Sequence, residues 1–186
     1  MGKSLWMSII ILLVPYGPLH ASDIQSPAQE YYAANKLFSQ GHYRDAIPLY
    51  KLALSSPSEQ LPKSDIYTRI GDSYFRLGEY NNALPSYRSA LASQNTSEQP
   101  ASQYWIAFCC LLMGNNDEAV AEFLKIPERY PSSGMWVGTA YYWAGRAAER
   151  GGRTEDAAEY YRKAGGNGRS TQGRFALKKA EAVQGK

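Results

Sequence analysis

Small and apolar residues recur along the chain at the spacing of amphipathic α-helices, and the helical stretches come in pairs. Ala46, Tyr50 and Ala53, for example, lie three and four positions apart and so share one side of a helix. Polar linkers rich in proline, serine and glycine separate the pairs. The pattern predicts first helices at about 27–40, 64–77, 100–113 and 135–150, and second helices at about 43–55, 80–93, 116–129 and 154–165.

One spaced motif recurs in all four pairs: a glycine, an alanine five residues later, and an aromatic residue four residues after that. The copies are Gly41–Ala46–Tyr50, Gly78–Ala83–Tyr87, Gly114–Ala119–Phe123 and Gly152–Ala157–Tyr161. The alanines at 46, 83, 119 and 157 are therefore 37, 36 and 38 residues apart. A fixed period of this length indicates stacked helix pairs, which build binding surfaces more often than reaction centres.

The motif resembles the tetratricopeptide repeat, and the second pair matches it best. The matching positions there are Tyr67, Ile70, Gly71, Tyr74, Gly78, Tyr80, Ala83, Tyr87 and Ala90. The resemblance covers about residues 27–165. It implies an all-α fold, a right-handed superhelical solenoid of about four helix-turn-helix repeats. Within a domain spanning 27–168, the repeats are expected at about 27–60, 64–97, 100–133 and 138–168.

Two further features concern the helices themselves. Pro48 and Pro85 lie inside the second helices of repeats one and two, where we expect kinks because proline removes a backbone hydrogen bond. Residues 170–184 read as a capping helix, which a helical stack needs at its end. Three of its apolar residues are expected to cover the last repeat: Phe175, Leu177 and Val183.

The first 21 residues have the pattern of a secretory signal peptide. Lys3 precedes an apolar run from Leu5 to Val14, and a cleavage site follows Ala21. The alternative is a signal anchor in the inner membrane, but about ten apolar residues are too few to span ~30 Å of hydrocarbon. We therefore predict an exported, periplasmic protein without a stable membrane span, with an extracellular location as a further alternative.

Composition and candidate chemistry argue against an enzyme. The net charge of +3 does not indicate nucleic acid as the partner. Adjacent Cys109 and Cys110 are read as core thiols, with a redox or metal pair as the alternative. His42 is the only histidine after the signal segment and falls in a turn. The sequence has no zinc-ligand spacing, phosphate-binding loop or nucleophile elbow, so no catalytic residue, metal or cofactor is predicted.

The repeat resemblance implies a binding surface on the inner face of the superhelix, lined by the first helices. The implied partner-binding residues are Tyr31, Asn35, Phe38, Thr68, Asp72, Phe75, Tyr104, Phe108, Leu111, Tyr142, Arg146 and Glu149. Aromatic residues on such a face suit an extended or helical peptide. The alternative is that several of them only pack between repeats. The chain from residue 141 onward has ten Lys/Arg against five Asp/Glu, which fits either an acidic partner or a solvated cap.

Short motifs resemble those of envelope repeats. Tyr104-Trp105 and Tyr142-Trp143-Ala144-Gly145 are similar to a Tyr-Trp-x-Gly opening, and Tyr130-Pro131-Ser132-Ser133 to a Tyr-Pro-x-Ser junction. Such repeats occur in the Tol-Pal coordinator, in outer-membrane assembly proteins and in lytic transglycosylases. The resemblance implies a non-catalytic scaffold or adaptor of the bacterial cell envelope that binds a protein or peptide. The alternatives are a glycan-binding accessory module of peptidoglycan-processing machinery, and self-assembly into homo-oligomers.

Overall fold

The computed structural model describes residues 26–55, 61–93, 100–166, 168 and 170–185, which contain nine α-helices and no strand. Every described helix lies within one residue of its predicted bounds. The predicted signal segment lies outside the described residues. The helices are α1 (Pro27–Ser39), α2 (Tyr43–Ser55), α3 (Lys63–Arg76), α4 (Tyr80–Ala92), α5 (Pro100–Leu112), α6 (Asn116–Arg129), α7 (Gly134–Arg150), α8 (Thr154–Gly165) and α9 (Thr171–Gln184).

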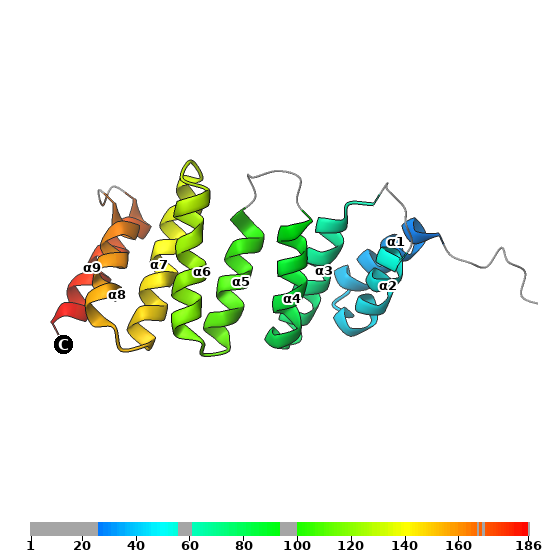
Figure 1. Cartoon of the computed structure of the whole chain (residues 1–186), viewed down its shortest axis with the longest axis horizontal. Helices are drawn as coiled ribbons and strands as arrows, with labels where there is room; N and C mark the ends of the chain where they lie inside the picture. The colour runs from blue at the N-terminus through cyan, green and yellow to red at the C-terminus, as the bar shows by residue number, and fades with distance from the viewer. Residues whose placement is uncertain (1–25, 56–60, 94–99, 167, 169, 186) are drawn as a thin grey trace, which may run out of the picture.

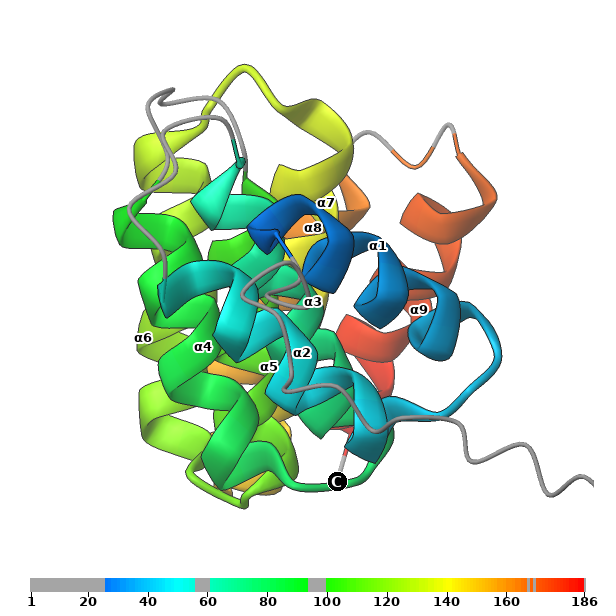
Figure 2. The same cartoon turned by 90° about the vertical axis from the view of Figure 1, so that its right-hand side faces the viewer.

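The helices form an elongated row in which each one packs against its neighbours in the chain (Figure 1). We call α1, α3, α5 and α7 the A helices and α2, α4, α6 and α8 the B helices. In Figure 1, α2, α4 and α6 lie in front of α1, α3 and α7. The end view separates α4 and α6 on one side from α1 and α7 on the other (Figure 2). The described residues therefore form the predicted solenoid of four helix pairs and a capping helix.

The turn inside each pair depends on a glycine in a left-handed conformation. Gly41, Gly78, Gly114 and Gly152 have φ of 82°, 74°, 82° and 76°. A side chain in this region is strained, so glycine is the residue that ends each A helix and starts the turn. In repeat four α7 starts at Gly134, one residue before the predicted start of that helix.

Small residues and aromatic rings form the core between A and B helices. The motif alanines at 46, 83, 119 and 157 are fully buried, as are the motif aromatics Tyr50, Tyr87, Phe123 and Tyr161. Burying one such side chain contributes roughly 1.5–3 kcal/mol. The core is thus one repeated contact, and it holds the A helices in a constant orientation along the row.

Pro48 and Pro85 are exposed and lie inside α2 and α4, which are each described as one continuous helix. The prolines remove a backbone donor on the solvent side without ending the helix.

The capping helix α9 packs on α8 through buried Ala176, Ala180 and Val183. The prediction that Phe175 covers the last repeat is wrong in part, because this side chain is 52% exposed. Phe175 lies one position before the buried row, so helical geometry turns it toward solvent. None of the described helices is long and apolar enough to cross a membrane.

Candidate partner-binding face

Each A helix leaves one stripe of side chains exposed or half-exposed, and all four stripes have the same register. One small residue of each A helix packs on the B helix: Ala34, Gly71, Ala107 and Gly145. The stripe occupies the positions six and two before this residue, and one and five after it. These spacings fall on one line along a helix. We call the four stripes together the A-face: Ala28, Tyr32, Asn35 and Ser39 on α1, Asp65, Arg69, Asp72 and Arg76 on α3, Ala101, Trp105, Phe108 and Leu112 on α5, and Thr139, Trp143, Arg146 and Arg150 on α7.

The character of the A-face changes from helix to helix. The stripe of α3 alternates aspartate and arginine, whereas α5 contains no charged residue at all. The stripe of α7 ends in Arg146 and Arg150, and the Nε atom of Arg146 is buried without a hydrogen-bond partner among the described residues. The A-face therefore has an apolar middle between two charged flanks.

Aromatic rings connect the A helices across the A-face. Phe75 of α3 meets Trp105 of α5 with ring centroids 5.1 Å apart, and Phe108 of α5 meets Trp143 of α7 at 4.8 Å. Both contacts are edge-to-face, and Trp105 and Phe108 are themselves 6.0 Å apart. Such pairs contribute about 0.5–1.5 kcal/mol beyond their buried area. They hold the apolar middle of the A-face in a defined shape.

A pocket of about 420 Å³ opens on the A-face between α3 and α5. Its walls combine carboxylates, a guanidinium and an indole ring, so it offers both polar and apolar contacts. This volume is within the range of known ligand sites. The lining residues are Asp65, Thr68, Asp72, Phe75, Arg76, Tyr87, Ala101, Ser102 and Trp105.

A buried tyrosine of the B helix donates a hydrogen bond to the A-face in the first two repeats. The Tyr50 hydroxyl donates to Asn35 Oδ1 at 2.8 Å, and the Tyr87 hydroxyl donates to Asp72 Oδ1 at 2.8 Å. Burial raises the pKa of Tyr50 to about 12 and raises that of Tyr87 further. Burial also raises the pKa of the Asp72 carboxyl, against the opposing effect of the Tyr87 hydrogen bond.

Repeats three and four vary this pair in a consistent way. In repeat three the B-helix aromatic is Phe123, which has no hydroxyl, and the A-helix position equivalent to Asn35 and Asp72 holds apolar Phe108. In repeat four the Tyr161 hydroxyl donates to Glu149 Oε2 at 2.7 Å, and Lys179 of α9 lies 3.8 Å from the same oxygen. Each motif tyrosine that buries a hydroxyl therefore donates it to a side-chain acceptor on the A helix, as the burial of a polar group requires.

The predicted partner-binding residues separate into three groups. Asn35, Asp72, Phe108 and Arg146 lie on the A-face. Thr68 and Phe75 line the pocket between α3 and α5. The residues of the third group contact neighbouring side chains of the protein: the aromatics through their rings, and Glu149 through the hydrogen bond from Tyr161. They are Tyr31, Phe38, Tyr104, Tyr142 and Glu149.

Leu111 corrects the prediction, because it is only 2% exposed and belongs to the core around α5 and α7. Its neighbour Leu112, 36% exposed, takes the place on the A-face that the repeat alignment gave to Leu111. Trp105 and Trp143 were also missed as site residues. The signal that could have found Trp105 is the i, i+4, i+7, i+11 spacing of apolar residues along α5, and Trp143 holds the same repeat position on α7.

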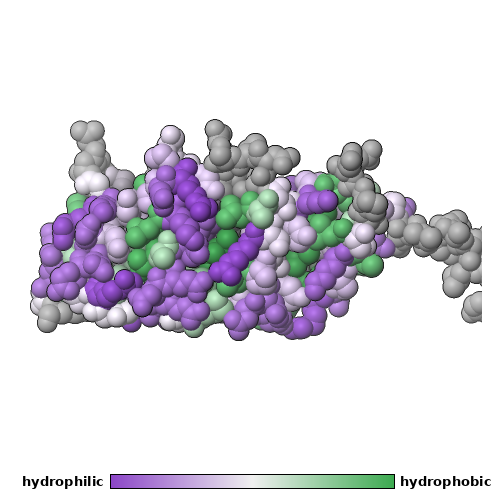
Figure 3. Space-filling model, in the orientation of Figure 1, coloured by the Kyte–Doolittle hydropathy of each residue, from purple (hydrophilic) through white to green (hydrophobic). Residues whose placement is uncertain are grey.

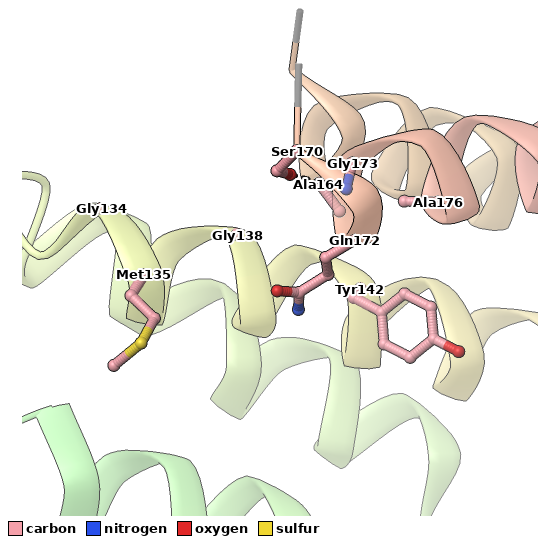
Figure 4. Close-up of a pocket in the computed structure, with 9 residues that line it drawn as sticks. All are labelled: Gly134, Met135, Gly138, Tyr142, Ala164, Ser170, Gln172, Gly173 and Ala176. Atoms are coloured by element: carbon pink, nitrogen blue, oxygen red, sulfur yellow. Dashed lines mark hydrogen bonds between the residues drawn. The ribbon is translucent and has the colours of Figure 1, made fainter. Parts of the chain in front are cut away.

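A smaller pocket of about 180 Å³ lies where α7 meets the start of α9 (Figure 4). Gln172 projects from α9 toward α7 between Gly138 and Tyr142, and Met135 lies near the start of α7. Tyr142 also contacts the exposed Phe175 ring at 6.1 Å. This pocket extends the predicted surface at Tyr142 to the capping helix, but it has little room.

The side that carries α2, α4 and α6 offers a weaker candidate. In Figure 3 its hydrophobic surface is divided into separate patches by hydrophilic strips. A shallow pocket of about 170 Å³ there is lined by residues of α2, α3 and α4, among them Lys51, Tyr67 and Pro85. Exposed Leu52 lies on the same helix as Lys51. No continuous apolar strip comparable to that of α5 is present on this side among the described residues.

The candidate chemical groups of the described chain are two cysteines and one histidine. Cys109 and Cys110 are both fully buried, which confirms their interpretation as core thiols. His42 is exposed, and its Nδ1 lies 3.8 Å from an exposed carboxylate oxygen of Asp45. Within the part of the chain that the structure describes, no three metal-binding side chains come together.

Comparisons with known proteins identify the family to which the chain belongs. The family model described as "Tetratricopeptide repeat" matches residues 68–134 and 137–170, more than half of the chain. The chain belongs to the tetratricopeptide repeat family, whose members are generally non-catalytic scaffolds for protein–protein interaction. No curated protein matches the sequence.

Several solved structures share the fold at low sequence identity. The MamA protein is 22% identical with a TM-score of 0.64, covering 77% of this chain and 73% of its own. YrrB, titled a repeat protein with an unusual peptide-binding site, is 23% identical with a TM-score of 0.67, covering 84% and 76%. A repeat protein from Parabacteroides merdae is 19% identical with a TM-score of 0.71, covering 87% and 61%.

Proposed function

We propose that this chain is an exported, non-catalytic adaptor of the bacterial cell envelope that holds a partner protein or peptide on its A-face. The observation that supports this most directly is the apolar strip of α5. Trp105, Phe108 and Leu112 are partly exposed on one line, on a helix without a single charge. Water-exposed apolar surface of this kind, bordered by polar residues, marks interaction sites.

The strip has the properties of a binding anchor. Ring contacts to Phe75 and Trp143 hold its side chains in place, so a partner loses little side-chain entropy on binding. Tryptophan is enriched at the energetic centres of interfaces, because it buries much area with few rotatable bonds. YrrB, which shares this fold, is described as having an unusual peptide-binding site. That precedent supports a peptide or protein as the molecule that binds the A-face.

The envelope part of the proposal has a separate basis. It rests on the signal-like segment at residues 1–21 and on the Tyr-Trp motifs at residues 104 and 142. The rival function, a glycan-binding accessory module, draws on the same A-face, since Trp105 and Trp143 could stack on sugar rings. The two functions differ in the molecule that contacts α5, which an experiment can identify.

Site-specific crosslinking in cells tests the proposal. A photo-crosslinking amino acid is placed in the full chain at Leu112 on α5, and in a matched variant at Leu52 on α2. Both are exposed leucines, 36% and 51%, on opposite helix layers. We expect Leu112 to give a discrete protein adduct and Leu52 to give none.

Other adducts would contradict the proposal. Adducts to glycan strands at Leu112 favour the accessory module, and protein adducts equal at both positions exclude the A-face as the specific surface. Protease added to intact spheroplasts tests export, because an exported chain is digested and a cytoplasmic one is protected.

A further inference from the structure

We infer that the partner presents an acidic amphipathic segment to the A-face, with apolar side chains along α5 and carboxylates toward Arg146 and Arg150 of α7. The inference rests on the proposed function, since it names the chemistry of the partner that the A-face holds. It follows from three features: the length of the apolar strip, the uncompensated charge on α7, and the balanced charge on α3.

The apolar strip sets the size of the docked segment. It runs from Ala101 to Leu112, and helical rise over those positions gives about 16 Å. Leu112 is exposed and the other three strip residues are half-buried, and the 13 residues of α5 carry no charge. A segment of about three helical turns, or about five extended residues, covers the strip. The partner therefore docks a short segment with an apolar row.

The stripe of α7 carries two positive charges, Arg146 and Arg150, one helical turn apart. Neither forms an ion pair among the described residues. The Nε atom of Arg146 is buried, and no described residue accepts a hydrogen bond from it, which is unfavourable for a buried donor. The nearby Glu149 accepts from Tyr161 and faces Lys179, so its charge is already engaged. A carboxylate from the partner would satisfy both arginines.

The α3 side does not compete for an acidic partner. Its stripe carries two aspartates and two arginines, so its formal charges cancel. Asp72 accepts from Tyr87, and the guanidinium of Arg69 lies 4.9 Å from the Phe38 ring centroid. The difference in net charge between the stripes of α3 and α7 therefore orients the docked segment, with its acidic edge on α7. Electrostatic complementarity of this kind determines partner choice and docking direction more than affinity.

A peptide-display selection tests the inference. The purified full chain selects from a library of random 16-residue peptides, in parallel with two double variants. Arg146→Glu with Arg150→Glu reverses the α7 flank, and Arg129→Glu with Arg162→Glu makes the same charge change at exposed positions of α6 and α8. A third variant, Leu112→Asp, interrupts the strip. Circular dichroism and melting temperature check that each variant folds, and Arg146→Gln with Arg150→Gln replaces the reversal if it does not fold.

We expect the wild-type pool to be enriched in peptides that combine Leu, Ile or Phe at helical spacing with Asp or Glu on one side. A single enriched peptide should lose at least tenfold in affinity against the α7 variant and against Leu112→Asp. It should keep its affinity against the control variant. Replacing the acidic residues of the peptide by lysine should also lower its affinity at least tenfold. This loss of affinity should be smaller at high salt.

The outcomes that overturn the inference differ from those that overturn the proposed function. Enriched peptides that need Leu112 but lack acids show that the A-face docks a segment of other chemistry. Equal losses in the α7 and control variants show that net charge alone attracts the peptides. If the Leu112→Asp variant enriches the same peptides as the wild type, the A-face is not the docking surface, and the proposed function is wrong.

Discussion

Gly145 of α7 lies directly against the ring of Tyr161 of α8: a β-carbon added to Gly145 would stand 2.8 Å from Tyr161 Cδ1. The same relationship recurs in repeat two, where a β-carbon on Gly71 would stand 2.7 Å from Tyr87 Cε1. Both rings are fully buried, and hydrogen bonds to Glu149 and Asp72 fix their hydroxyl ends. The rings cannot move aside cheaply, so in repeats two and four the A helix approaches the B helix this closely only because glycine is present.

Gly145→Ala should therefore lower the free energy of unfolding by about 1–3 kcal/mol through overpacking, in spite of the better helix propensity of alanine. Gly138→Ala on the same helix is the control. A β-carbon there meets nothing closer than the Ala164 carbonyl oxygen at 3.9 Å, so stability should rise by about 0.5–1 kcal/mol. Urea denaturation measures both. Equal stabilisation by the two substitutions would show that the Tyr161 ring yields.

The raised pKa of Asp72 makes a prediction about pH. Because the folded chain binds this proton more tightly than the unfolded chain, the Asp72 contribution favours folding at acidic pH. It is lost as pH rises from the ordinary aspartate range through the raised pKa. Asp72→Asn keeps an acceptor for Tyr87, as Asn35 does for Tyr50, and removes this titration.

We expect Asp72→Asn to be more stable than wild type at pH 7, and the difference to shrink as the pH falls toward 4. Urea midpoints across that range measure it. Asp65→Asn, at an exposed aspartate on the same stripe, is the control for the loss of one carboxylate from the A-face. A constant difference across the range for Asp72→Asn would contradict the assignment.

Phe108 holds the A-helix position that Asn35 and Asp72 hold in repeats one and two, which predicts a coupling between Phe108 and Phe123. Phe123→Tyr places a hydroxyl in a fully buried site where no polar side chain of the pair accepts it, so we expect a loss of about 1–3 kcal/mol. Adding Phe108→Asn recreates the Tyr50–Asn35 pair of repeat one. A double-mutant cycle in urea should give a favourable coupling energy of about 1 kcal/mol. Additive effects would show that the register of repeat three differs from that of repeat one.

The helices could be predicted from sequence because each repeat marks its own geometry. Glycine at 41, 78, 114 and 152 ends an A helix, and the alanine and aromatic that follow define the buried side of the B helix. These are local requirements of backbone and volume, so the pattern alone expresses them. The exposure of Phe175 was missed because it depends on the rotation of α9 about its own axis.

The binding face could be predicted only in part, for the same kind of reason. The repeat alignment identified the A helices, but it chose positions such as Tyr104 and Leu111 that turn toward the core. The exposed stripe lies one residue away, at Trp105 and Leu112. Helix rotation by a single residue is about 100°, and it is decided by packing against both neighbouring helices. The absence of charge on α5 is visible in the sequence, whereas the engagement of Glu149 by Tyr161 depends on tertiary contacts.

Cys109 and Cys110 provide a test of the core that is independent of the A-face. Burial raises the pKa of both thiols to about 12. At pH 8 about one thiol in ten thousand is then ionised, and the thiolate is the reactive form. Iodoacetamide should leave both cysteines unmodified in the folded chain and alkylate both in 6 M guanidinium, as mass spectrometry would show. Rapid alkylation of the folded chain, or a Cys109–Cys110 disulfide in the purified protein, would mean that α5 opens far more readily than its packing between α4, α6 and α7 allows.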